Sequence, residues 1–184
     1  MQLQYAISAT DYQAYYTWVM WDAPKNKKRR ATYFLRQGLP LLAFLAAFYY
    51  TGTFAGFSRF TWLAIFFLAA TFGFSFFNVR SKYQRIALEI AEDPANASIF
   101  LSNLLTIDNS GIVLKNEQSA HHFSWQAFIR KEETKDHYFL FVSAIQALIV
   151  PKRIFTTDVE RQQFASLLSK NISLDAEFAA SLGS

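Results

Sequence analysis

Histidine is the side chain best suited to acid–base chemistry and metal binding near neutral pH, and this chain has three. His121 and His122 are adjacent, so on a strand they would point to opposite faces, which is poor geometry for sharing one metal ion. His137 stands apart from them. The chain has no cysteine, which excludes disulfides, thiol catalysis and thiolate metal sites. The sequence therefore predicts no metal site.

The adjacent carboxylates Glu132 and Glu133 are the other candidates for acid–base work, but neighbouring strand residues diverge. They are interspersed with Arg130, Lys131 and Lys135, so we interpret the segment as a charged hairpin edge that discourages edge-to-edge pairing. The sequence contains no phosphate-binding glycine loop, no Gly-x-Ser-x-Gly and no His-Glu-x-x-His. We expect no enzymatic activity, no catalytic residue and no cofactor.

Two groups of cations are candidates for contact with anionic lipid or a partner protein. The first group is Lys25, Lys27, Lys28, Arg29 and Arg30. The second is Lys152 and Arg153, which with the cations of the charged hairpin edge could form a basic rim for lipid headgroups or a phosphorylated ligand. The alternative, which we favour for the second group, is that Pro151 ends a strand, Phe155 fills the core and both cations are solvated.

The element that must position the first group is an apolar stretch from Gly38 to Val79, whose only charged side chain is Arg59. As one helix it would be roughly 63 Å long, about twice the thickness of the hydrocarbon core of a bilayer. The sequence therefore predicts a two-helix transmembrane hairpin, with spans near 38–54 and 60–79 and a turn at Arg59.

The charges that flank this stretch predict its orientation. The cations before and after it are Lys25, Lys27, Lys28, Arg29, Arg30, Arg36, Arg80, Lys82 and Arg85. Because positive loops stay in the cytoplasm, we expect both termini to be cytoplasmic. The pI is about 9.3, but residues 99–170 hold eight Lys or Arg against seven Asp or Glu. The basic excess lies at the membrane boundary, so we expect membrane lipids and not nucleic acid as partners.

Before the hairpin, Leu3–Ser8 alternates apolar and polar residues and predicts a weak strand. Thr10-Asp11 then resembles a helix cap, followed by the aromatic segment Tyr12–Trp21. Two interpretations of this segment stay open. It is a short amphipathic helix on the inner membrane surface, or a helix packed on the cytoplasmic domain.

After the hairpin, a helix is expected to continue as far as Asp93-Pro94. Short strands at close spacing then predict an antiparallel barrel or sandwich. The expected strands are Phe100–Ile107, Ile112–Lys115, Ala120–Ser124, Phe128–Glu133, His137–Val142 and Ala147–Val150. A final helix starts at Thr157, where Glu160 completes a capping box, and closes the barrel.

These elements predict an α+β membrane protein in which a transmembrane hairpin precedes a small PH-like antiparallel β-barrel or sandwich with a C-terminal capping helix. We expect five divisions: an N-terminal strand, helix and basic segment (1–37), the hairpin (38–79), a juxtamembrane helix and linker (80–98), the cytoplasmic domain (99–170) and a flexible tail (171–184). Whether the N-terminal strand joins the C-terminal sheet is left open.

The domain also contains four short motifs: Asp108-x-x-Gly111-Ile112, Trp125-x-x-Phe128, Tyr138-x-Leu140 and Ala147-Leu148-Ile149-Val150-Pro151-Lys152-Arg153-x-Phe155. Through these motifs it resembles the YcxB-like family of bacterial proteins. The resemblance covers about Leu104–Leu168 and implies two membrane helices before the domain, with Gly111, Trp125, Pro151 and Phe155 as domain anchors. Phe128 stands where the family usually has an aliphatic residue. The resemblance implies no established activity.

Taken together, these features favour a non-enzymatic interaction module anchored in the bacterial inner membrane, which holds its domain at the cytoplasmic face and binds protein or anionic lipid. The alternative is a subunit of an oligomeric transport or channel complex. Two spans are too few to enclose a pathway alone, and neither contains the buried acid or base that transporters generally need.

Overall fold

The computed structural model describes residues 1–50 and 59–172. The chain divides into two compact units. The first combines Met1–Tyr15 with the chain from Ala87 onward, and the second is Tyr16–Ile86. The expected segment 1–37 is therefore split between the units, and the domain begins well before residue 99. The reason is that strands from both ends of the chain pair with one another.

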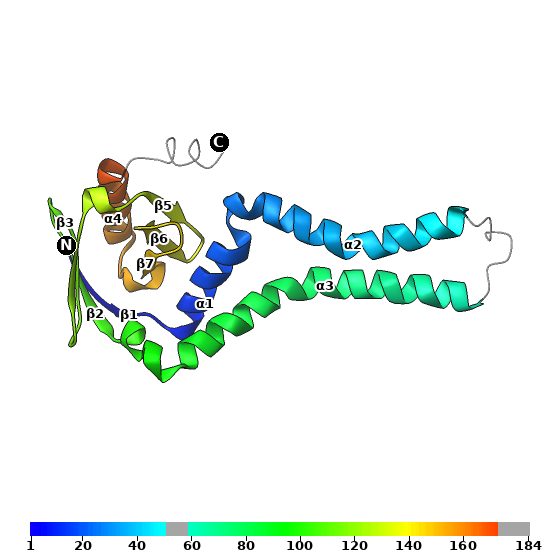
Figure 1. The fold of residues 1–184 in the computed structure, drawn as a ribbon. Coiled ribbons are helices and arrows are strands. Elements are labelled where there is room, and N and C mark those ends of the chain that lie inside the picture. Colours follow the sequence, from blue (N-terminus) through cyan, green and yellow to red (C-terminus); the bar gives the residue numbers. More distant parts are fainter. Residues whose placement is uncertain (51–58, 173–184) are drawn as a thin grey trace. The chain divides into compact units, whose positions relative to one another are not determined.

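The first unit contains two antiparallel sheets, of order β1-β2-β3-β4 and β5-β6-β7 (Figure 1). The strands are β1 (Gln2–Ala6), β2 (Ser102–Ile107), β3 (Gly111–Lys115), β4 (Ala120–Ser124), β5 (Arg130–Glu133), β6 (His137–Phe141) and β7 (Ala147–Pro151). The helix α4 (Asp158–Asn171) follows, and its Phe164 and Leu168 are buried. The unit is the α+β architecture of small sheets and one final helix that the sequence predicts.

Strand β1 joins the C-terminal sheet, which answers the question that the sequence leaves open. It pairs antiparallel with β2, placing Gln2 opposite Thr106 and Ala6 opposite Ser102. Tyr5 is buried, and its hydroxyl donates a 2.9 Å hydrogen bond to the carbonyl oxygen of Ile149 on β7. One N-terminal strand therefore contacts both sheets.

The later elements begin close to where the sequence predicts them. Residues 94–100 and 125–127 form short 3₁₀ helices, so β2 and β5 each start two residues later than expected. The predicted capping box of α4 is confirmed, because Thr157 and Glu160 each accept a hydrogen bond from the other's backbone N–H. Ile172 is buried, which corrects the expected start of the tail at 171, and residues 173–184 lie outside the described chain.

The N-terminal helix α1 (Ala9–Thr17) starts earlier than Thr10-Asp11 would suggest. Its cap is Ser8, whose hydroxyl accepts from the backbone N–H of Asp11 at 3.2 Å. The carboxylate of Asp11 accepts in return from the backbone N–H of Ser8 at 2.8 Å. This is the reciprocal pattern of a capping box with aspartate in place of glutamate.

Four helical elements belong largely to the second unit. They are the π-helix Trp18–Asp22, the 3₁₀ helix Pro24–Asn26, α2 (Lys27–Tyr50) and α3 (Arg59–Glu92). The expected first span lies in α2 as far as Tyr50, while residues 51–58 lie outside the described chain. Arg59, where the turn is expected, is instead the first residue of α3. The expected second span lies in α3, which ends directly before Asp93-Pro94, as predicted.

Helices α2 and α3 pack antiparallel through aromatic side chains. The ring centroids of Phe34 and Phe76 are 4.8 Å apart. Four residues further along α2, a Cβ added at Gly38 would lie 3.6 Å from the Phe72 ring. The packing leaves large apolar side chains exposed on both helices, among them Leu42, Phe74 and Phe77.

One segment of the described chain, Leu63–Glu92 in α3, is long and apolar enough to cross a membrane by length and composition. Its apolar window is almost entirely unburied, at 6%. A helix in the core of a soluble protein would bury that surface. The described part of the first expected span does not meet the same criterion.

Candidate functional site

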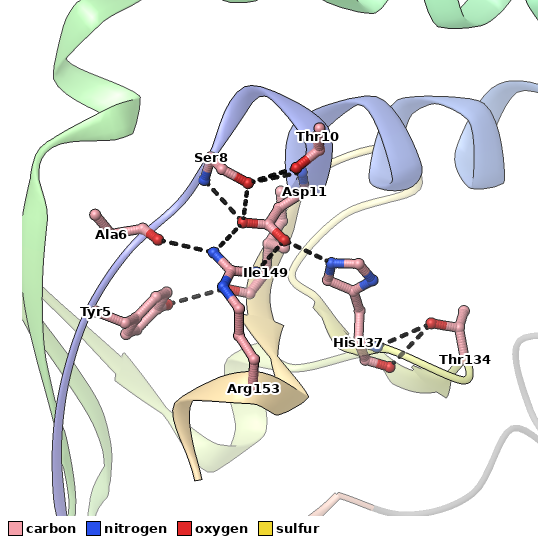
Figure 2. Close-up of polar contacts among 9 residues, drawn as sticks. All are labelled: Tyr5, Ala6, Ser8, Thr10, Asp11, Thr134, His137, Ile149 and Arg153. Atoms are coloured by element: carbon pink, nitrogen blue, oxygen red, sulfur yellow. Dashed lines mark hydrogen bonds and ion pairs between the residues drawn. The ribbon is translucent and has the colours of Figure 1, made fainter. Parts of the chain in front are cut away.

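The densest polar cluster in the first unit forms where α1 meets the end of β7 (Figure 2). Its centre is Asp11, whose side chain is only 4% exposed. Ser8, His137 and Arg153 all hydrogen-bond to this carboxylate. We call these four residues the Asp11 cluster. It joins three segments that are far apart in the sequence.

The histidine of the cluster is held from several sides. The Nε2 atom of His137 lies 2.9 Å from Oδ1 of Asp11. Its ring stacks on Phe139, with centroids 5.5 Å apart and an interplanar angle of 11°. Its backbone N–H donates to the hydroxyl of Thr134 at 3.1 Å, and that hydroxyl donates to its carbonyl at 3.2 Å. The imidazole is therefore fixed in place and directed at the carboxylate.

The arginine of the cluster spans both carboxylate oxygens. Its Nη1 contacts Oδ1 of Asp11, and its Nη2 donates to Oδ2 at 2.6 Å. The same Nη2 donates to the carbonyl of Ala6 at 3.3 Å. A two-point contact of this kind fixes orientation as well as charge. Arg153 therefore holds the end of β1 and the start of α1 against the corner that follows β7.

The surroundings of Asp11 act on its pKa in opposite directions. Burial alone would raise the pKa of this carboxyl, but the hydrogen bonds from His137, Arg153 and Ser8 outweigh burial and hold it far below its usual range. The hydrogen bond to Asp11 raises the pKa of Arg153. Burial, with the nearby negative charge of Asp11, raises the pKa of Tyr5. Asp11 is therefore ionised throughout the physiological range.

The Asp11 cluster is arranged to hold segments together. In a charge-relay triad the histidine lies between the nucleophilic hydroxyl or thiol and the carboxylate. Here the Ser8 hydroxyl contacts the carboxylate, at 2.6 Å, so the order of contacts is not that of a charge-relay triad. In the described chain no group of three His, Asp or Glu side chains gathers as metal ligands.

The predicted basic rim takes a different form in the structure. Nζ of Lys152 lies 2.6 Å from Glu133, and it also lies 4.8 Å from the Tyr138 ring centroid. Arg130 is buried, lies over the ring of Phe141 at 3.8 Å and pairs with Glu132 at 2.9 Å. Since Arg153 binds Asp11, the favoured interpretation of Lys152 and Arg153 as solvated cations is incomplete. Both are ion-paired within the domain.

The first group of cations lies at the start of α2. Lys25, Lys27, Lys28 and Arg29 are exposed. Arg29 also donates to the hydroxyl of Tyr83 at 3.0 Å. Arg30 differs, because its Nη1 donates to the carbonyl oxygens at the end of the π-helix, those of Trp21, Asp22 and Ala23. One of the five predicted contact residues therefore caps a helix.

The aromatic segment Tyr12–Trp21 packs on protein. Tyr15 packs on the domain, as in the second of its two interpretations, whereas Trp21 packs on the helical unit. Tyr15 is buried, meets Phe139 edge-on at 5.6 Å and donates its hydroxyl to the carbonyl of Ile145. Trp21 is also buried and stacks on Tyr83 at 5.6 Å. These side chains are not available to enter a membrane as an apolar face.

The four expected anchors differ in burial. Pro151 is fully buried, and Trp125 is buried with its indole N–H donating to the carbonyl of Asp108 at 3.3 Å. Phe155 is only half-buried, although its ring packs on Phe164 at 5.1 Å. Gly111 has φ +156°, and an added Cβ would lie 2.0 Å from the backbone oxygen of Phe123. The strongest steric requirement therefore lies at Gly111.

The remaining histidines diverge as expected. His121 stacks on Phe123, with centroids 6.3 Å apart, while Nε2 of His122 lies 3.3 Å from the Ser110 hydroxyl. Sequence reasoning missed the roles of Asp11 and His137. The one available signal is Asp11 itself, a carboxylate directly before an aromatic helix and three residues after Ser8.

The first unit is thus an α+β domain of two antiparallel sheets and a closing helix, assembled from both ends of the chain and linked to a helical unit with one candidate membrane span. Residues 107–168 match the family model described as "YcxB-like protein", so the chain carries a YcxB-like domain there. His137 and Arg153 lie inside the match, and β1 and Asp11 lie outside it. No curated protein and no solved structure matches the chain significantly.

The Asp11 cluster predicts how stability depends on pH. An aspartate whose pKa is lowered by folding adds stability above its unfolded pKa of about 3.9, and this stability is lost progressively as the pH falls below that value. Replacing Asp11 with asparagine removes the ionic contacts. Because Arg153 is half-exposed, we expect a cost of about 2–3 kcal/mol at neutral pH, below that of a fully buried pair. Thermal melts of the full chain in detergent between pH 7 and pH 3 measure it.

The control for this experiment is Asp158→Asn, because Asp158 is exposed and forms only a surface pair with Arg161. We expect its melting temperature to follow that of the parent at every pH. An Asp11→Asn variant that melts like the parent at pH 7 would show that the cluster contributes nothing to stability.

Proposed function

We propose that this protein is a non-enzymatic interaction module anchored in the bacterial inner membrane. A helical hairpin of two spans, near 38–54 and 60–79, carries a PH-like domain at the cytoplasmic face, where it contacts protein or anionic lipid. The PH-like assignment is supported by seven strands in two antiparallel sheets followed by one capped helix.

The observation that carries this proposal is the pairing of β1 with β2. Paired strands lie on the same side of a membrane, so the chain between them crosses it an even number of times. If the apolar segment of α3 is one crossing, a second crossing is required between β1 and α3. The stretch near 38–54 is the candidate, because it has no charged side chain.

The flanking charges support cytoplasmic termini, since the cations cluster at the start of α2 and after Val79. Among them, Lys27, Lys28 and Arg29 are exposed and suited to contact anionic headgroups. The paired Lys152 and Arg153 are less suited, because each already binds a carboxylate. The domain would then offer a surface for protein partners while the hairpin fixes its distance from the bilayer.

Topology can be tested with reporter fusions after Arg30, Gly56 and Ser184. We expect these to report cytoplasmic, external and cytoplasmic locations, because two crossings separate the first position from the last. The fusion after Ser184 serves as the control for that after Arg30, since β1–β2 pairing requires both on one side. An external location for Ser184 would overturn the hairpin.

A further inference from the structure

The antiparallel register of α2 and α3 places the charged residues that flank their apolar segments at different depths in the proposed membrane. Phe34 packs against Phe76, and Gly38 faces Phe72, so Arg36 lies level with Phe74. On α3 the chain stays uncharged for five more residues, to Val79, before Arg80. At a rise of about 1.5 Å per residue, the backbone of Arg36 therefore lies about 7.5 Å deeper in the proposed membrane than that of Val79.

The surfaces of the two helices differ in polarity at this depth. On α3, Phe74 and Phe77 are 71% and 78% exposed. On α2, Arg36 is exposed one turn after the exposed Thr32. Arg36 makes no hydrogen bond or ion pair with the described residues. Residues four apart lie on one helix face, so Thr32 and Arg36 present a hydroxyl and a guanidinium together.

The backbone at the same turn also lacks one of its usual helical donors. Pro40 lies inside α2 and has no N–H, so it cannot donate the helical hydrogen bond to the carbonyl of Arg36. An unsatisfied carbonyl and a cation are both costly in hydrocarbon. A phospholipid headgroup at this level, with its bound water, would satisfy both.

We propose that Arg36, with Thr32, binds the phosphate of an anionic phospholipid in the cytoplasmic leaflet. This inference rests on the proposed membrane hairpin and deepens it by naming a lipid site. Side chains on a helix lean toward its N-terminus, which here is the cytoplasmic end of α2. The guanidinium of Arg36 therefore reaches up toward the headgroups while the methylene chain stays among apolar groups. Its planar donor fork matches two phosphate oxygens.

The test uses the full chain purified in a neutral detergent. Native mass spectrometry counts bound lipids as phosphatidylglycerol or phosphatidylcholine is added, with and without inorganic phosphate. We expect phosphatidylglycerol to be retained, phosphatidylcholine to be retained weakly and free phosphate not to compete. Arg36→Gln should weaken phosphatidylglycerol binding about tenfold, and Arg36→Lys should fall between the two because it keeps the charge without the fork.

The matched control is Lys82→Gln, which removes an exposed cation located beyond Val79. Its lipid binding should equal that of the parent. Equal losses of phosphatidylglycerol binding in both variants would mean that the lipid is attracted diffusely to cations. Displacement of the lipid by free phosphate would mean a site for soluble anions. A shift from dimer to monomer in Arg36→Gln would mean that Arg36 contacts a second copy of the chain. Each of these results, or unchanged binding in Arg36→Gln, overturns the lipid site. If the proposed membrane hairpin is itself wrong, the chain should be recovered in solution without detergent, which is a separate readout.

Discussion

Replacing Gly111 with alanine is expected to unfold the four-stranded sheet. The added Cβ would lie 2.0 Å from the backbone oxygen of Phe123, and 2.9 Å from two further backbone atoms, so no side-chain rotation relieves the overlap. The φ of +156° adds backbone strain for any residue with a Cβ. We expect a cost of about 4 kcal/mol or more, a large part of the stability of a small domain.

Hydrogen exchange of the full chain in detergent measures this effect locally. Peptides from β2, β3 and β4 should lose protection in Gly111→Ala, while peptides from α3 keep theirs. The matched control is Gly73→Ala, where a Cβ meets nothing within 4 Å. Gly73 lies in a helix, so alanine there should be neutral or slightly stabilising. Parent-like protection of β2–β4 in Gly111→Ala would contradict the reported geometry of this turn.

The second large effect is expected when the N-terminal segment is removed. The fragment Ala87–Ile172 contains the whole YcxB-like match, but it lacks β1 and Asp11. Without them β2 pairs only with β3 and becomes an edge strand, and Arg153 and His137 lose the carboxylate that joins them. We expect this fragment to show no cooperative thermal transition by circular dichroism.

Adding the peptide Met1–Thr17 in trans should restore a cooperative transition, because the peptide supplies both the missing strand and the carboxylate. The same peptide with Asp11→Asn should restore it at a lower melting temperature. A scrambled peptide of the same composition is the control and should have no effect. A fragment that melts cooperatively alone would show that β1 is an accessory to the domain and not part of it.

The sequence predicts the elements from β2 to α4 well because their signals are local. The turn before Gly111 is formed by the Asp108 carboxylate, which accepts from the backbone N–H groups of Ser110 and Gly111 at 2.7 and 3.0 Å. The capping box of α4 lies within four residues. Such contacts can be inferred from residue types at fixed spacing.

The contacts that the sequence does not predict join residues more than a hundred positions apart. Nothing in the alternation of β1 indicates that Gln2 lies opposite Thr106, since a weak strand pattern is compatible with several partners. The pairing of Asp11 with His137 and Arg153 depends on that register. The candidate site therefore becomes visible only once the two ends of the chain are brought together.

The separation of β1 from β2 has a consequence for biosynthesis. A ribosome adds about 5–20 residues per second, so β1 leaves the exit tunnel roughly 5–20 s before its partner is made. During that interval both long helices are synthesised, and Tyr5, buried in the finished domain, has no partner strand to pack with. The pairing of β1 with β2 is thus a late step. It joins residues far apart in the sequence, and contacts of this kind form slowly. We therefore expect the N-terminal strand to stay unpaired until β2 has been made.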